Sequence, residues 1–264
     1  MKIKKLLCVM LGLLLVAILC PYVSVNASTS EKISFLKYDL SEHDFVNREV
    51  VCNQAIDSSE EVKWETGWYF VRGDVTIDKR VYVEGDVGLI LLDGCKLECK
   101  GGIEVEKAVT GKDPQIEIYA QSTGDNKGRL IASGDEYGAG IGSDDPAVVY
   151  NQDICGDITI HGGYIEATGG NLAAGIGGGQ DGKGGSVSVS GGEVFANGGG
   201  YASGIGGGQD EKNGTIDVSS DVRLYDNNLK EYIEIPFNKS NLTSYLSQYL
   251  FKKNNVLNNV VATS

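Results

Sequence analysis

Two acidic turns carry the residues whose types and spacing best suit chemistry. The turn Gly-Gly-Gly-Gln-Asp ends at Asp181 and recurs 29 residues later, ending at Asp210. If the chain stacks on itself with that period, the two carboxylates lie about 5 Å apart, the spacing of neighbouring strands. Carboxylate, amide and backbone oxygens are the ligands that calcium prefers. The turns therefore favour solvated acids, with a calcium site as the alternative. Asp144 and Asp145 occupy the corresponding turn of an earlier copy.

The same acid pair could act as general acid and base in glycoside hydrolysis, but nothing selects it among the other carboxylates of the chain. A lyase needs a basic proton acceptor, and the segment from 134 to 214 contains no arginine and only two lysines. His43 and His161 have no partner histidine or cysteine at a ligand spacing, so both are expected at the surface. We therefore predict no catalytic residue and favour a protein that is not an enzyme.

Four aromatic residues could stack on sugar rings. Tyr137 and Tyr201 take matching positions before a Gly-Ile-Gly motif, and Tyr164 and Phe195 fall on outward phases of neighbouring repeats. An exposed row of rings suits a polymer chain, because each ring offers a flat apolar face. The alternative is that these rings pack under terminal caps or under an inserted segment near 146–155.

A glycine-rich repeat must position all of these residues. Glycine supplies 26 of the 81 residues from 134 to 214, and three short segments of alternating aliphatic residues recur there with a period of 29. Superposing the repeats places Ile158, Val187 and Ile216 in one column and Ile165 on Val194. One repeat cannot bury such a face alone, whereas stacked repeats form a continuous core. The sequence therefore predicts an all-β fold, a right-handed parallel β-helix solenoid with terminal caps.

The N-terminal residues resemble a secretory signal. Three lysines among the first five residues precede an apolar run that ends at Cys20, and the small residues Val25 and Ala27 follow it. We expect cleavage after Ala27 and a secreted protein, found in the medium or associated with the cell surface. The expected organisation is a signal peptide at 1–27, an N-terminal segment and cap at 28–67, the β-helix at 68–228, and a C-terminal cap and tail at 229–264.

The net charge of the chain excludes some classes of partner. The formal net charge is −13, and removal of the signal's lysines makes it more negative. Such a surface repels phosphate, which argues against nucleic acid, and no later stretch is apolar enough for membrane insertion.

Four cysteines remain after cleavage, and export permits a disulfide. The spacing of the four favours buried thiols, with one disulfide as the alternative. They are Cys52, Cys95, Cys99 and Cys155.

The repeated Ala/Ser-Gly-Ile-Gly-Gly-Gly resembles glycine-rich β-helix regions of secreted and cell-surface proteins from Gram-positive bacteria. The run from Trp68 to Ile77, followed by Leu89 to Leu97, looks like the entry coil of that group, and the resemblance covers about residues 64–226. More distantly, the chain is similar to pectate-lyase-like β-helix proteins and to their non-catalytic carbohydrate-binding relatives. That likeness implies extracellular polysaccharide contact with calcium as a candidate cofactor, and it carries no catalytic residue over.

These observations predict a secreted, acidic β-helix that binds polysaccharide, such as a cell-wall or host-surface glycan, or serves as an adhesive structural module. A polysaccharide lyase or glycoside hydrolase of the pectate-lyase-like group is the alternative. The sequence leaves the glycan, the partner and the oligomeric state open.

Overall fold

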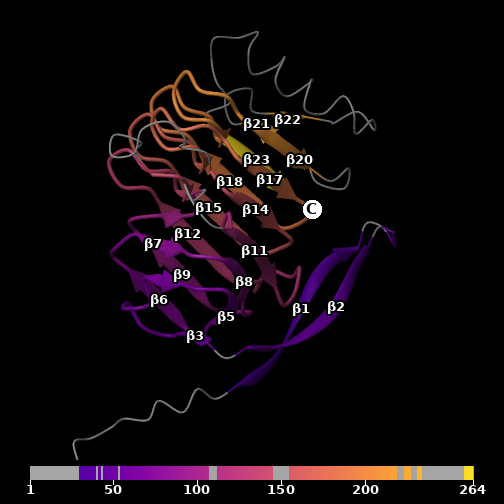
Figure 1. Ribbon diagram of the computed structural model, residues 1–264. Coiled ribbons are helices and arrows are strands. Elements are labelled where there is room, and N and C mark those ends of the chain that lie inside the picture. The colour runs from indigo at the N-terminus through magenta and orange to yellow at the C-terminus, as the bar shows by residue number, and fades with distance from the viewer. Residues whose placement is uncertain are drawn as a thin grey trace, which may run out of the picture.

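The computed structural model describes residues 30–39, 41–42, 44–52, 54–106, 112–144, 155–218, 223–226, 231–233 and 259–263. Within these ranges the chain is a parallel β-helix: short strands of successive coils stack into three sheets (Figure 1). No helix in the described part is long and apolar enough to cross a membrane.

From residue 67 to residue 206 each coil visits the three sheets in the same order, which we label A, C and B. Sheet A stacks β3 (Gln54–Ile56), β5 (Gly67–Val71), β8 (Asp86–Leu91), β11 (Gln115–Ala120), β14 (Asp157–Ile160), β17 (Ser186–Val189) and β20 (Thr215–Val218). Sheet C stacks β6 (Asp74–Ile77), β9 (Lys96–Cys99), β12 (Arg129–Ser133), β15 (Tyr164–Thr168) and β18 (Glu193–Asn197). Sheet B stacks β4 (Lys63–Trp64), β7 (Val81–Val83), β10 (Ile103–Glu104), β13 (Ile141–Gly142), β16 (Ile176–Gly177) and β19 (Ile205–Gly206).

Three further strands join sheet C by antiparallel pairing. They are β21 (Arg223–Asp226), β22 (Glu231–Ile233) and β23 (Asn259–Thr263). Strand β23 lies between β18 and β21, and β22 pairs with the other edge of β21. Pairing in the parallel sheets begins at β3 and β4, which precede residue 68. The residues of the expected signal peptide lie outside the described part of the chain.

The stacking register is the one that the 29-residue period predicts. Val187 pairs with Ile158 on one side and with Ile216 on the other, and Ile165 pairs with Val194. All of these side chains are buried in one aliphatic core that runs through the coils. The period-two alternation places every second residue of each strand inside, so stacking removes a continuous apolar column from water.

Sheet B turns sharply at a column of glycines. Gly142, Gly177 and Gly206 pair with one another and have φ values of 147°, 131° and 139°. A Cβ atom at Gly177 would collide with the carbonyl oxygen of Gly206 in the next coil. Glycine is therefore required here both for the positive φ and for the close approach of the backbones.

A long N-terminal hairpin covers part of the outer face of sheet A. Strands β1 (Glu31–Asp39) and β2 (Asp44–Cys52) pair along their whole length, and β1 contacts β11 through the pair Leu36 and Ala120 (Figure 1). The hairpin and the outer face of the sheet bury a second apolar cluster, made of Ile33, Phe35, Cys52, Phe70, Ile90 and Tyr119. The solenoid thus has an internal core and, near its N-terminal end, an external one.

The four cysteines of the described part are free thiols. Burial raises the pKa of Cys52 to about 11 and that of Cys99 to about 12, so both stay protonated at neutral pH. Cys155 is buried in the internal core, and Cys95 accepts a hydrogen bond from the backbone N–H of Gly73 at 3.1 Å. These side chains act as small apolar groups, in agreement with the favoured prediction.

Candidate functional site

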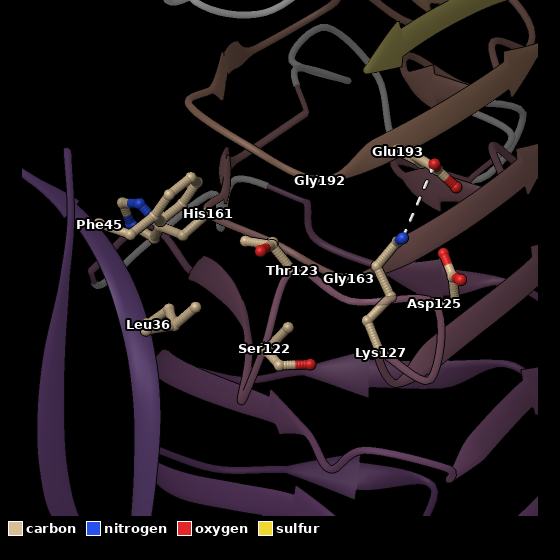
Figure 2. Close-up of a pocket in the computed structure, with 12 residues that line it drawn as sticks. Leu36, Phe45, Ser122, Thr123, Asp125, Lys127, His161, Gly163, Gly192 and Glu193 are labelled. Atoms are coloured by element: carbon tan, nitrogen blue, oxygen red, sulfur yellow. Dashed lines mark ion pairs between the residues drawn. The ribbon is translucent and has the colours of Figure 1, made fainter. Parts of the chain in front are cut away.

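A pocket of about 130 Å³ opens where the hairpin meets the turns that lead from sheet A to sheet C. Leu36 and Phe45 form its hairpin wall, and the facing side chains come from three consecutive coils (Figure 2). The lining residues of those coils are Ala120, Ser122, Thr123, Asp125, Lys127, His161, Gly162, Gly163, Gly192 and Glu193.

The pocket exists because the three turns differ in length. After β14 and β17 the chain turns on glycine pairs, in which Gly163 and Gly192 have φ values of 98° and 91°. A Cβ at Gly192 would lie 2.7 Å from the carbonyl oxygen of Gly163, so these turns stack closely and offer no side chain. After β11 the turn is longer, from Gln121 to Gly128, and it supplies the polar groups of the wall.

Acidic and basic groups face each other at this wall. Lys127 is largely buried, and its Nζ atom lies 3.7 Å from Glu193 Oε1 and donates a hydrogen bond to the carbonyl of Gly124 at 3.3 Å. Figure 2 shows Lys127 and Glu193 pointing toward one another, with Asp125 beside them. The wall therefore offers one cationic donor and two carboxylate acceptors to a polar ligand.

A hydrogen-bonded network lies beneath the pocket, on the outer face of sheet A. His161 is only 6% exposed, its ring stacks on Tyr119 with centroids 4.7 Å apart, and its Nε2 lies 3.3 Å from Glu117 Oε2. Its Nδ1 lies 2.9 Å from Ser190 Oγ. The expectation that His161 lies at the surface was wrong, because the stacked Tyr119 ring and its neighbours in adjacent coils enclose the imidazole.

Glu117 is the charged centre of this network. The pKa of Glu117 is lowered to about 2, chiefly by the hydrogen bond with His161 and against the opposing effect of burial. A hydrogen bond donated by the hydroxyl of Tyr119 and the nearby ammonium group of Lys37 lower it further. Burial, followed by this same hydrogen bond, raises the pKa of Tyr119 far above its ordinary value. Glu117 is therefore ionised and Tyr119 neutral across the physiological range.

Two of the four predicted aromatic residues meet next to the pocket. Tyr164 follows the pocket-lining Gly163, and its ring lies 5.1 Å from that of Phe195 on the outer face of sheet C. The guanidinium carbon of Arg129 lies 4.2 Å from the centre of the Tyr164 ring, a cation–π contact. The aromatic pair thus adjoins the pocket at Gly163, and neither ring is among the pocket's lining residues.

The other two predicted aromatics lie elsewhere. Tyr137 and Tyr201 belong to the turns that lead from sheet C to sheet B, and Tyr201 is 70% exposed. The carbonyl oxygen of Tyr137 accepts a hydrogen bond from the backbone N–H of Gln180. The four residues therefore divide between two parts of the surface and do not follow one strand face.

The predicted calcium ligands are also divided. Asp181 and Asp210 lie in consecutive turns between sheets B and A, with φ values of 54° and 60°, and each accepts a long hydrogen bond from the amide of the preceding glutamine. Gln180 Oε1 is buried with no hydrogen-bond partner in the described part of the chain. Within these ranges no group of three or more His, Cys, Asp or Glu side chains could hold a metal ion. Calcium therefore stays a prediction.

Asp144 has a different surrounding, because it lies 3.5 Å from the buried guanidinium of Arg80; Asp145 lies outside the described residues. Arg80 also pairs with Glu104 at 3.1 Å and with Asp135 at 3.5 Å, and it donates to two backbone carbonyls. Burial raises the pKa values of Glu104 and Asp135, opposed by Arg80. This arginine comes from outside the segment 134–214 and links three coils.

The search of curated proteins and the search of solved structures returned no match. Two segments of the chain, residues 158–180 and 187–209, match the family model described as Beta helix repeat. Each segment runs from sheet A through sheet C to sheet B and ends in an acidic turn, so each is nearly one coil. The repeats matched by the family model are therefore the coils of the solenoid.

Proposed function

We propose that this protein is an extracellular β-helix that binds polysaccharide where the aromatic pair of sheet C adjoins the polar pocket. The observation that carries the proposal is the contact between Tyr164 and Phe195 at the pocket edge, with Arg129 on the Tyr164 ring.

The proposed site combines the two kinds of surface that a sugar needs. The C–H face of a sugar ring packs on an aromatic ring, and its hydroxyls need donors and acceptors in fixed places. Tyr164 and Phe195 supply the ring faces, whereas Lys127, Asp125 and Glu193 supply a donor and two acceptors within the same edge. A pocket of about 130 Å³ accommodates one substituent or residue of a polymer, and the rest of the polymer lies across the coils.

The N-terminal sequence supports the extracellular part of the proposal. Lysines followed by an apolar run and small residues are typical of a secretory signal, and the negative net charge attracts divalent cations and repels phosphate. Calcium bound at the turns of Asp181 and Asp210 would neutralise part of this charge, so we include it as a candidate cofactor of glycan binding.

The test is retention of the protein on cellulose, pectin, cell-wall fragments and a glycan array, each with calcium and with a chelator. We expect Tyr164→Ala and Phe195→Ala each to weaken binding about tenfold, the value of about 1.4 kcal/mol expected for a stacked ring. Tyr201→Ala is the matched control, because it removes an exposed aromatic ring from a different turn. Equal losses in the control would place the site elsewhere, and no retention on any glycan under either condition would refute the function.

A further inference from the structure

A serine, a histidine and a glutamate from three consecutive coils form a linear hydrogen-bonded chain on the outer face of sheet A. Glu117 lies on β11, His161 directly follows β14, and Ser190 directly follows β17. His161 Nδ1 lies 2.9 Å from Ser190 Oγ, and His161 Nε2 lies 3.3 Å from Glu117 Oε2. This is the arrangement of a nucleophile, its base and the group that orients the base.

The charges of the network assign the protons. Because Glu117 is ionised, it accepts the Nε2–H of the imidazole, and the Nδ1 lone pair then faces the hydroxyl of Ser190. Ser190 Oγ also donates a hydrogen bond to the carbonyl oxygen of Ile160 at 3.3 Å, so its one proton has two acceptors, of which His161 Nδ1 at 2.9 Å is the nearer. The shorter contact favours donation of the Ser190 hydroxyl to His161, the state required for nucleophilic attack.

The pocket gives this chain a place for a substrate. His161 and Gly192 line it, and Ser190, which is not a lining residue, lies beside it: Ser190 is hydrogen-bonded to His161 and precedes Gly192 by two positions. Ser190 is itself partly exposed, and Gly191, the next residue, packs against the Phe45 ring of the hairpin. The backbone N–H that follows a nucleophilic serine is a position from which oxyanion donors act in hydrolases.

We propose that Ser190 is a nucleophile that cleaves small O-acyl esters, such as acetyl groups on sugars. Ser190 Oγ attacks the ester carbonyl carbon while its proton passes to His161 Nδ1. The C–O bond to the sugar then breaks, and the departing sugar oxygen takes that proton. Water, deprotonated by His161, attacks the acyl-serine, releases the carboxylic acid and returns the proton to Ser190. Glu117 acts through His161 and is a positioning residue.

The size of the pocket sets the substrate class. A pocket of about 130 Å³ is small, which suits an acetyl group better than a long acyl chain. The apolar side chains of Leu36 and Phe45 on the hairpin wall suit the methyl group. The choice of a sugar as the alcohol rests on the proposed polysaccharide binding, whereas the reactivity of Ser190 does not.

The secreted form, expected to begin at Ser28, is treated with a fluorophosphonate probe, and the site of the adduct is mapped by peptide mass spectrometry. Hydrolysis of p-nitrophenyl acetate and p-nitrophenyl octanoate, and release of acetate from acetylated xylan, are measured in parallel. We expect an adduct on Ser190, its loss in Ser190→Ala, and hydrolysis of the acetate but not the octanoate. His161→Gln should slow acetate hydrolysis about 100-fold.

Ser188→Ala is the matched control, because Ser188 lies on the outer face of β17, two residues before Ser190. It should keep both the adduct and the wild-type rate. Glu117→Gln should lower the melting temperature but leave the protein folded at the assay temperature, as circular dichroism would show, and it should change the pH–rate profile of acetate hydrolysis, a result that loss of folding would not give. Absence of an adduct on Ser190, or equal acetate hydrolysis by wild type and Ser190→Ala, overturns the proposal. Binding of Ser190→Ala to deacetylated glycans reports separately on the proposed function.

Discussion

The two halves of sheet A have the same inner face but different outer faces. Inside, the column is aliphatic from coil to coil, as in the stack of Ile158, Val187 and Ile216. Outside, the first coils present Phe70 and Ile90, which are buried under the hairpin together with Tyr119 from the next coil.

In the following coils the outer column becomes polar. His161 stacks on Tyr119, and Ser190 continues the column beyond it. The hairpin reaches the same point, where Phe45 packs against Gly191. The pocket and the Glu117 network therefore lie where the apolar cover ends and uncovered coils begin. The comparison teaches that stacking alone stabilises the regular coils, whereas a site forms where something other than a coil meets them.

The largest expected effect comes from breaking the regular coils. Gly177→Ala places a methyl group against the backbone of the next coil at a φ of 131°, so we expect a loss of about 4 kcal/mol in unfolding free energy. Hydrogen exchange should show the loss of protection spreading through 155–218, because each coil depends on its neighbours.

Gly124→Ala is the control for this substitution. Gly124 lies in the turn after β11, and the atom nearest to an added Cβ is Ser122 Oγ at 3.8 Å. A change below about 0.5 kcal/mol is expected, measured by urea unfolding. If both alanine variants lose the same free energy, close coil stacking is not what distinguishes the regular region.

The next effect concerns the covered coils. Phe35 is 5% exposed and lies 4.6 Å from Tyr119 and 5.2 Å from Trp68 between ring centroids. Phe35→Ala should destabilise the hairpin by about 3 kcal/mol, the cost of emptying a buried aromatic site. Limited proteolysis should then cut within 31–52 while the coils of 155–218 stay protected.

The control within the hairpin is Val51→Ala, because Val51 is 59% exposed and contributes little buried area. It should leave the proteolysis pattern unchanged. If Phe35→Ala loses protection in the hairpin and in the distant coils at the same time, the two halves unfold as one unit. That result would contradict the distinction between covered and uncovered coils.

The periodic part of this structure was predictable from sequence, and the contact of His161 with Ser190 was implied by it. These two residues are 29 positions apart, one coil, so the register that stacks Ile160 on Val189 also brings them together. The lack of a metal-ligand spacing around His161 predicts a surface position for it, whereas the period that relates Asp181 to Asp210 also relates His161 to Ser190. The outward phase of Tyr164 and Phe195, which meet in the structure, followed from the same alternation.

What the sequence did not reveal lies where the period is broken. Glu117 is 44 residues before His161, so the repeat does not relate them. The hairpin is not a coil, and its place over the outer face of sheet A depends on contacts between residues such as Phe35 and Tyr119, which no short-range pattern encodes. The pairing of Arg80 with Asp144 likewise crosses coils of unequal length.

The smallest expected effect tests the junction itself, through the pH dependence of stability. The pKa of Glu117 falls from an ordinary 4.5 to about 2 in the folded protein, so the carboxylate stabilises the fold fully above pH 4.5. This contribution is lost as the pH falls from about 4.5 toward 2, because both states then bind the proton. Because the side chain of Glu117 is 34% exposed, solvent screening reduces the contribution to about 2 kcal/mol.

Three groups stabilise the ionised carboxylate of Glu117: His161 from the next coil, Tyr119 from the same strand, and Lys37 from the hairpin. Urea unfolding at pH 7 and pH 3 should therefore show a smaller pH effect in Glu117→Gln than in wild type, while Glu166→Gln, a change on the outer face of sheet C, keeps the wild-type difference. A wild-type pH dependence in Glu117→Gln would mean that the junction between hairpin and coils is not held by this carboxylate.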